Sequence, residues 1–170
     1  MKFQIISKSN IKDLVIIKIE GFSDFRGENF ESFNNDEFNK IVPNWNFKNF
    51  VIDSFSKSKY GVIRGFHGDS KNWKLVECLS GCVFLNIIDT RENSESFNKS
   101  ESFTLNENNK IQILIPPGCV NAHQCISDSC LFHYKLTESY VKQEDQITRK
   151  WNSKNIFWPI NNPILSQRDL

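Results

Sequence analysis

The sequence predicts an all-β fold, a sandwich or a barrel, with a few short helices. Short apolar runs, separated by Gly, Pro, Asn and Asp, dominate the chain. Such runs at short spacing are typical of strands joined by turns. Little helical periodicity lies between them, so an alternation of strands and helices around a parallel sheet is not expected. No internal repeat with a period of roughly 20–50 residues is visible.

The expected strands follow one another in chain order. They cover residues 14–19, 50–55, 61–66, 74–78, 83–88, 111–115, 119–126 and 130–136. Ser80 and Gly81 form a hairpin-type turn between the fourth and fifth of these strands. Pro116, Pro117 and Gly118 end the sixth strand, because proline cannot continue a ladder and glycine favours a turn.

Helical structure is expected in two short segments only. A helix is predicted at 35–40, with Asn34 or Asn35 as its cap, and a short turn near 142–145. The stretch 28–49 is polar enough to resemble a linker, but its Phe and Trp residues predict that it packs. A chain of 170 residues is of ordinary size for one core. We therefore expect a single domain over residues 1–170.

Composition excludes several classes of partner. The net charge is +1 and the pI about 7.6, so no basic field would attract nucleic acid or an anionic membrane. Polar residues interrupt the N-terminal segment, which is unlike a signal peptide, and no apolar run is long enough for a membrane span. A cytoplasmic protein is expected. The five cysteines form no Cys-x-x-Cys pair, so we expect buried thiols rather than disulfides or structural zinc.

Histidine is scarce, which narrows the search for a general base. The chain has only His67, His123 and His133, and histidine is the commonest base at neutral pH. His67 ends the expected strand Gly61-Val-Ile-Arg-Gly-Phe-His67, whose two glycines would permit close backbone approach beside a ligand. Taken alone, the segment favours a structural histidine whose hydrogen bonds are satisfied.

Strand alternation assigns faces to the other polar candidates. Asn121, His123 and Cys125 should share one face of their strand. Tyr134 should lie on the core-directed face of the next strand and His133 on the opposite face. A buried tyrosine hydroxyl needs a partner, which is either the backbone or a ligand.

Motifs for metals and cofactors are not apparent. Gly68 and Asp69 follow His67 without a second histidine nearby, whereas a metal site in a β-barrel of this kind needs a histidine cluster. The chain has neither a glycine-rich phosphate loop nor a Gly-x-Ser-x-Gly elbow. We therefore expect no metal and no cofactor.

Several motifs, taken in order, are more specific than any one of them. They include Asp24-Phe-Arg-Gly27 with Glu31-Ser32, Gly61-Val-Ile-Arg-Gly-Phe-His67, Lys74-Leu-Val76, Asp89-Thr-Arg91, Ile115-Pro-Pro-Gly118, Phe132-His-Tyr-Lys135 and Leu165-Ser-Gln-Arg-Asp169. In this order and spacing the chain resembles the dTDP-4-dehydrorhamnose 3,5-epimerase family nearly end to end.

The resemblance implies a fold, a substrate class and residue roles. The fold would be a cupin-type jelly-roll β-barrel, usually a homodimer with strands shared between protomers. The substrate would be a nucleotide-linked 4-keto sugar, epimerised beside the ketone without a cofactor. The matching positions imply His67 as base, Asp169 as the residue that orients it, Tyr134 as acid and Lys74 at the enolate oxygen. Substrate contacts are implied for Arg26, Glu31 and Arg64.

The chain departs from the family pattern near the expected substrate. Asn121 stands where the family has His, and His123 stands where it has Phe. Both are expected to contact substrate. Together with Gly68 and Asp69, these departures favour the branch that acts on GDP-linked 4-keto-heptoses for capsular polysaccharide, by epimerisation at C3 or at C3 and C5. The alternatives are a dTDP-4-dehydro-6-deoxyglucose 3,5-epimerase, a non-catalytic sugar-binding cupin and a cupin ketoisomerase.

Overall fold

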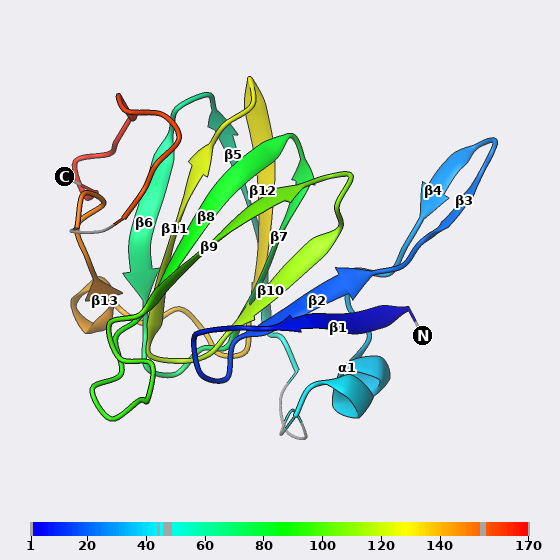
Figure 1. The fold of residues 1–170 in the computed structure, drawn as a ribbon, viewed down its shortest axis with the longest axis horizontal. Helices are drawn as coiled ribbons and strands as arrows, with labels where there is room; N and C mark the ends of the chain where they lie inside the picture. The colour runs from blue at the N-terminus through cyan, green and yellow to red at the C-terminus, as the bar shows by residue number, and fades with distance from the viewer. Residues whose placement is uncertain (1, 44, 46–48, 154–155, 170) are drawn as a thin grey trace.

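Two antiparallel sheets face each other and enclose most of the core (Figure 1). The computed structural model describes residues 2–43, 45, 49–153 and 156–169. The larger sheet has the order β1-β2-β10-β7-β12-β5 and the smaller one β13-β6-β11-β8-β9. From β5 to β13 the chain crosses from one sheet to the other at every step except β8 to β9, as in a jelly roll. The expected all-β, cupin-type jelly-roll barrel is confirmed.

The larger sheet contains six strands. They are β1 (Phe3–Lys8), β2 (Val15–Ile19), β10 (Ile111–Ile115), β7 (Lys74–Ser80), β12 (Ser129–Leu136) and β5 (Ile52–Lys59). The smaller sheet contains β13 (Ile147–Thr148), β6 (Ile63–Gly68), β11 (Cys119–Cys125), β8 (Cys82–Asp89) and β9 (Ser100–Asn106). A separate ribbon consists of β3 (Phe22–Asp24) and β4 (Gly27–Asn29).

The main hydrophobic core lies between the sheets. Fully buried side chains such as Val76 and Ile113 from the larger sheet meet Leu85 and Leu105 from the smaller one. Four of the five thiols, those of Cys78, Cys119, Cys125 and Cys130, are buried, and none forms a disulfide. Thiols behave as small apolar groups in such positions, as the sequence predicted.

Helix α1 (Asn35–Ile41) covers a second cluster outside the larger sheet. Asn34 caps it, because its side-chain oxygen accepts hydrogen bonds from the backbone amides of Asp36 and Glu37. Phe38 is the helix residue that packs against Phe3, with ring centroids 5.3 Å apart. The predicted helix and cap are confirmed, and the short turn near 142–145 is a 3-10 helix at Gln143–Asp145.

All eight predicted strands occur, several with shifted ends, and five were missed. The strand predicted at 14–19 is β2, which begins one residue later, at Val15. The strand predicted at 50–55 lies at Ile52–Lys59. The missed elements are β1, β3, β4, β9 and β13. β9 does alternate in burial, but the polar residues Ser, Glu, Thr and Asn occupy five of its seven positions, which hides the period of two.

The β3–β4 ribbon projects away from the barrel as an arm (Figure 1). Phe25 at its tip is 97% exposed and Phe22 is 66% exposed. Large aromatic side chains in such positions indicate a contact surface rather than part of this chain's core. Within the described residues, no helix is long and apolar enough to cross a membrane.

The C-terminal tail returns to the outer strand β6. Ile164 forms a parallel bridge with Val62, and its backbone exchanges hydrogen bonds with Ile63 and Gly61, each of 3.0 Å. Gln124 is fully buried and holds the backbone of Ile160 through two side-chain bonds. These bonds fix the end of the chain beside the smaller sheet.

Candidate active site

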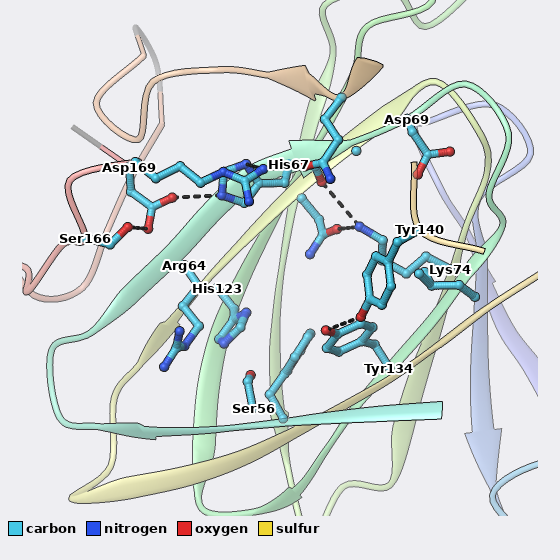
Figure 2. Close-up of a pocket in the computed structure, with 16 residues that line it drawn as sticks. Ser56, Arg64, His67, Asp69, Lys74, His123, Tyr134, Tyr140, Ser166 and Asp169 are labelled. Atoms are coloured by element: carbon cyan, nitrogen blue, oxygen red, sulfur yellow. Dashed lines mark hydrogen bonds and ion pairs between the residues drawn. The ribbon is translucent and has the colours of Figure 1, made fainter. Parts of the chain in front are cut away.

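A pocket of about 350 Å³ opens between the two sheets and the C-terminal tail (Figure 2). It is lined by Ser56, Arg64, His67, Gly68, Asp69, Lys74, Asn121, His123, Phe132, Tyr134, Leu136, Tyr140, Gln146, Ser166, Arg168 and Asp169. Its volume lies at the lower end of the range for small-ligand pockets, roughly 300–1,000 Å³. A single sugar ring would fill much of it.

His67 and Asp169 form a hydrogen-bonded pair at one wall. The Nε2 atom of His67 lies 2.8 Å from Oδ1 of Asp169. An ionised carboxylate can only accept, so Nε2 donates and the lone pair of the neutral ring is on Nδ1. Nδ1 has a contact of 3.5 Å with Arg168 Nη2, which is long for a hydrogen bond. This nitrogen is therefore available to take a proton.

The pKa of His67 is lowered, chiefly by burial. The positive charge of Arg168 lowers it further, while Asp169 opposes both effects. Burial disfavours the charged imidazolium, and a nearby carboxylate favours it. The balance keeps the ring neutral at neutral pH, which is the form that a general base requires.

Asp169 is fixed in place although it is close to the end of the chain. Its side chain is 6% exposed, and Oδ2 accepts a 2.7 Å hydrogen bond from Ser166 Oγ. Its backbone amide donates to the Ser166 carbonyl at 3.0 Å. A residue this near to a terminus would ordinarily fray. The turn at Ser166 and the bridge to β6 prevent this.

Lys74 lies partly buried at the start of β7. Its ammonium group donates to Asn121 Oδ1 at 2.8 Å and to the His67 carbonyl at 3.3 Å. An ammonium has three donors, so these two bonds leave one for a substrate oxygen. Burial lowers the pKa of Lys74 to about 8, with the charge of Asp69 opposing the shift.

Tyr134 faces the pocket from β12. Its hydroxyl is 2.7 Å from that of Tyr140, which in turn donates to Ser54 Oγ at 3.4 Å. Burial and, to a smaller extent, the hydrogen bond with Tyr140 together raise the pKa of Tyr134 to about 12. The phenol stays protonated through the neutral range and can act as a proton donor. The predicted faces of Tyr134 and His133 are confirmed, because His133 bonds Glu77 and Asp53 outside the pocket.

The fold places the predicted base and the predicted acid on opposite walls. His67 belongs to β6 of the smaller sheet and Tyr134 to β12 of the larger one. Figure 2 shows the two side chains across the cavity, with Lys74 near the Tyr134 side. A planar group bound between them would have a proton acceptor on one face and a donor on the other.

The remaining predicted contacts divide into two groups. Arg64, Asn121 and His123 line the pocket as expected. Arg26 and Glu31 do not line the pocket, because Arg26 lies at the tip of the arm and Glu31 lies just after β4. Arg26 pairs with Asp24 at 2.6 Å, and Glu31 pairs with Lys2 at 2.7 Å. Within one chain, the structure does not bring these two residues to the site.

Sequence reasoning missed several residues at the site. Ser56, Asp69, Tyr140, Gln146, Ser166 and Arg168 line the pocket without having been assigned a role. Ser166 and Arg168 belong to the tail motif, which was a usable signal. Tyr140 follows β12 in an irregular segment with no pattern, so only its bond to Tyr134 reveals it. The expected role of Gly65 was also inexact, because its open side faces the β11 backbone rather than the pocket.

Clusters suited to a metal ion were not found. Among the described residues, no group of three or more His, Cys, Asp and Glu side chains is placed to hold one. The chemistry available at this site is that of the imidazole, the carboxylate, the phenol and the ammonium group.

A jelly-roll barrel with a His–Asp pair opposite a tyrosine is a protein of the cupin class whose pocket is suited to acid–base chemistry. The model of the dTDP-4-dehydrorhamnose 3,5-epimerase family matches residues 8–170. A relative of that name from Shigella flexneri is 38% identical, with 97% of this chain and 92% of the relative aligned. One from Escherichia coli K12 is 36% identical, with 96% and 90% aligned. The chain belongs to the dTDP-4-dehydrorhamnose 3,5-epimerase family.

Solved structures agree with this assignment. The dTDP-4-dehydrorhamnose 3,5-epimerase of Elizabethkingia anophelis superposes with a TM-score of 0.88 at 35% identity, covering 99% of this chain and 94% of that one. A 3,5-epimerase of Legionella pneumophila, in complex with dTDP-4-keto-L-rhamnose, gives 0.90 at 32% identity, covering 98% and 89%.

Proposed function

We propose that the protein is a cofactor-independent epimerase that inverts C3 and C5 of a nucleotide-linked 4-keto sugar. The observation that carries the proposal is the placement of His67, paired with Asp169, and Tyr134 on opposite walls of one pocket. Inversion needs proton removal from one face of a carbon and proton delivery to the other. Family membership supports the same reaction.

The proposed reaction begins with proton abstraction beside the ketone. Nδ1 of His67 takes the proton. The electron pair of the broken C–H bond forms the carbon–carbon double bond of the enolate, and the carbonyl π electrons move to the oxygen, to which Lys74 donates a hydrogen bond. A positioned oxyanion donor of this kind contributes about 3–4 kcal/mol. Tyr134 then protonates the carbon from the opposite face. Asp169 fixes the tautomer of His67 and stabilises the imidazolium that forms.

The relatives support dTDP as the nucleotide. They are named dTDP-4-dehydrorhamnose 3,5-epimerases, and one related structure holds a dTDP-linked 4-keto sugar. This favours the expected alternative, a dTDP-4-dehydro-6-deoxyglucose 3,5-epimerase, over a GDP-linked 4-keto-heptose as substrate. It also favours inversion at both carbons over inversion at C3 alone. The heptose remains a second candidate because Asn121 and His123, the two departures from the family pattern, both line the pocket.

The proposed assembly is a homodimer in which the arm of one chain completes the pocket of the other. The arm carries Arg26, whose side chain is 73% exposed, and the nearly fully exposed Phe25. Neither residue lines this chain's own pocket, and the arm that carries them projects away from the barrel (Figure 1). A partner's arm would bring the substrate contact implied for Arg26 to the site.

The test is solvent exchange in heavy water, followed by NMR. We expect deuterium at C3 and C5 of dTDP-4-dehydro-6-deoxyglucose, with inversion, and almost none with His67→Asn. Exchange of GDP-4-keto-heptose at a higher kcat/KM would select the second candidate. Binding of both sugars without exchange would leave a sugar-binding cupin and refute the epimerase. Movement of the carbonyl to another carbon would indicate a ketoisomerase.

A further inference from the structure

Two buried polar atoms in the pocket have no hydrogen-bond partner among the described residues. They are Oγ of Ser56 and Nε2 of His123. Both residues line the pocket, and Figure 2 shows them together at the end away from Lys74. Buried polar atoms are nearly always paired, so an unpaired one needs an explanation. Two at the same end of one pocket indicate a missing ligand group.

Packing around Phe132 holds both side chains in position. The ring of His123 stacks on that of Phe132 with centroids 3.9 Å apart and an interplanar angle of 18°. Ser56 lies directly opposite Phe132 in the pairing of β5 with β12. His123 comes from β11 of the smaller sheet, so the two polar atoms approach the pocket from facing sheets.

The chemistry of this pair suits a hydroxyl. Burial and, to a smaller extent, the positive charges of Arg64 and Lys74 together lower the pKa of His123 to about 3. The neutral ring has one donor and one acceptor nitrogen, and the serine hydroxyl can do both. A hydroxyl, which also donates and accepts, would satisfy both groups. A methyl group in the same place would leave both unpaired.

The cavity volume limits which sugar substituent reaches this end. About 350 Å³ leaves little room beyond a sugar, so C1, which carries the nucleotide, would have to lie toward solvent. The ring carbon opposite C1 is C4, and its neighbour C5 carries the side chain. A hydroxyl on C6 would be β to the ketone and would leave as water once C5 loses its proton. A hydroxyl that survives epimerisation must therefore lie one carbon further out, on C7.

We propose that Ser56 and His123 form a hydroxyl subsite that selects 4-keto sugars with a hydroxylated side chain. The inference rests on the proposed epimerase function and leaves the nucleotide open. Between the two candidate sugars it favours the heptose, because the C5 side chain of 6-deoxyglucose is a methyl group and has no hydroxyl to offer. It assigns a specificity role to the histidine that stands where the family pattern has phenylalanine.

Two matched sugars on one nucleotide test the subsite. They are dTDP-4-dehydro-6-deoxyheptose, which ends in a C7 hydroxyl, and the 6,7-dideoxy analogue, which ends in a methyl group. For deuterium exchange by the wild type, we expect kcat/KM about 10- to 100-fold higher with the hydroxylated sugar. His123→Phe, which keeps the stack on Phe132, and Ser56→Ala should each reduce this ratio. Ser96→Ala, a buried serine outside the pocket, should preserve it.

Each outcome separates the subsite from the enzyme function. A wild-type preference for the methyl sugar, or a ratio unchanged by either pocket variant, would overturn the subsite and assign both atoms to a trapped water. If dTDP-4-dehydro-6-deoxyglucose exchanges but neither heptose does, the subsite is overturned and the epimerase proposal stands. If none of the three sugars exchanges, the epimerase proposal fails, and calorimetric binding to His67→Asn decides the subsite alone. Tighter binding of the hydroxylated sugar that is lost in His67→Asn/His123→Phe would then support it, and equal affinities would refute it.

Discussion

At the scale of single residues, His67 depends on groups from distant parts of the chain. Asp169 bonds one ring nitrogen at 2.8 Å, and Ser166 in turn holds that carboxylate at 2.7 Å. Arg168 lies on the other side of the ring. The arrangement lets the carboxylate fix the tautomer while the cation and burial keep the ring neutral. Two testable consequences follow from these contacts and from those of Lys74.

Asp169→Asn should lower kcat for exchange by about 10²–10⁴-fold, because the tautomer of His67 is no longer fixed. KM should change little, since the side chain is buried behind His67. Asp128→Asn, which changes an exposed carboxylate in a turn, is the matched control. Steady-state kinetics with folded protein checks the prediction. A rise in KM as large as the fall in kcat would contradict the orienting role.

The pH profile of kcat/KM should be bell-shaped, with the acidic limb set by His67 and the basic limb set by Lys74. His67 must be neutral, and its lowered pKa places the acidic limb below about pH 6.5. Asp169 raises this pKa, so Asp169→Asn should move the limb to still lower pH. Lys74 must be charged, and its pKa of about 8 places the basic limb near pH 8.

Lys74→Gln should remove the basic limb and reduce the rate about 10²–10³-fold. Tyr134 cannot produce this limb, because its pKa of about 12 is far higher. Lys71→Gln, a change at a nearby exposed lysine, serves as the control. A basic limb near pH 8 that persists in Lys74→Gln would refute the assignment.

At the scale of elements, the contact between β6 and β11 positions the site. A Cβ on Gly65 would lie 2.5 Å from the Asn121 carbonyl oxygen and 2.7 Å from Ala122 Cα. The missing side chain therefore lets β6, which carries His67, approach the strand that carries Asn121 and His123. The register also shifts here, because Asn121 pairs with His67 and His123 pairs with Arg64, so that β6 carries one extra residue. This bulge lets Arg64 and His67, three residues apart, both line the pocket.

Gly65→Ala should destabilise the protein by about 1–3 kcal/mol through overpacking, beyond the cost of its positive φ. Gly27→Ala is a matched control, because Gly27 has φ +120° against +119° for Gly65 and nothing within 4 Å of its added Cβ. The difference between their free energies of unfolding, measured by denaturant titration, isolates the crowding. Equal losses in the free energy of unfolding would mean that the close approach of β6 and β11 does not contribute to stability.

At the scale of the whole molecule, the pocket of one chain lacks the arm residues expected at it. If a partner supplies the arm, His67→Asn and Arg26→Ala homodimers should each be impaired. Mixing and re-equilibrating them should restore activity, because a heterodimer has one site with both native groups. Recovery of exchange on mixing is the measurement. The shared site would be refuted if the exchange activity of the mixture did not exceed the sum of the activities of the two separate variants. A monomer by analytical ultracentrifugation would also refute it.

Much of the site could be predicted from the sequence because its residues lie in short motifs within strands. Alternation assigned Tyr134 to the interior and His133 to the exterior, and the apolar runs located the strands that form the two sheets. Prediction failed where the pattern was weak. β9 has an alternating but polar sequence, and Tyr140 follows β12 without any periodicity.

By itself, the sequence determined the β architecture, the family and the identity of the residues that can move protons, since these depend on local pattern and residue type. Only the tertiary structure decided their relations. It placed Asp169 beside His67 through the bridge of the tail to β6, and it separated His67 from Tyr134 by assigning their strands to facing sheets. It also left Ser56 and His123 unpaired in the same pocket. Such relations join residues far apart in the chain, and packing of the two sheets rather than local propensity creates them.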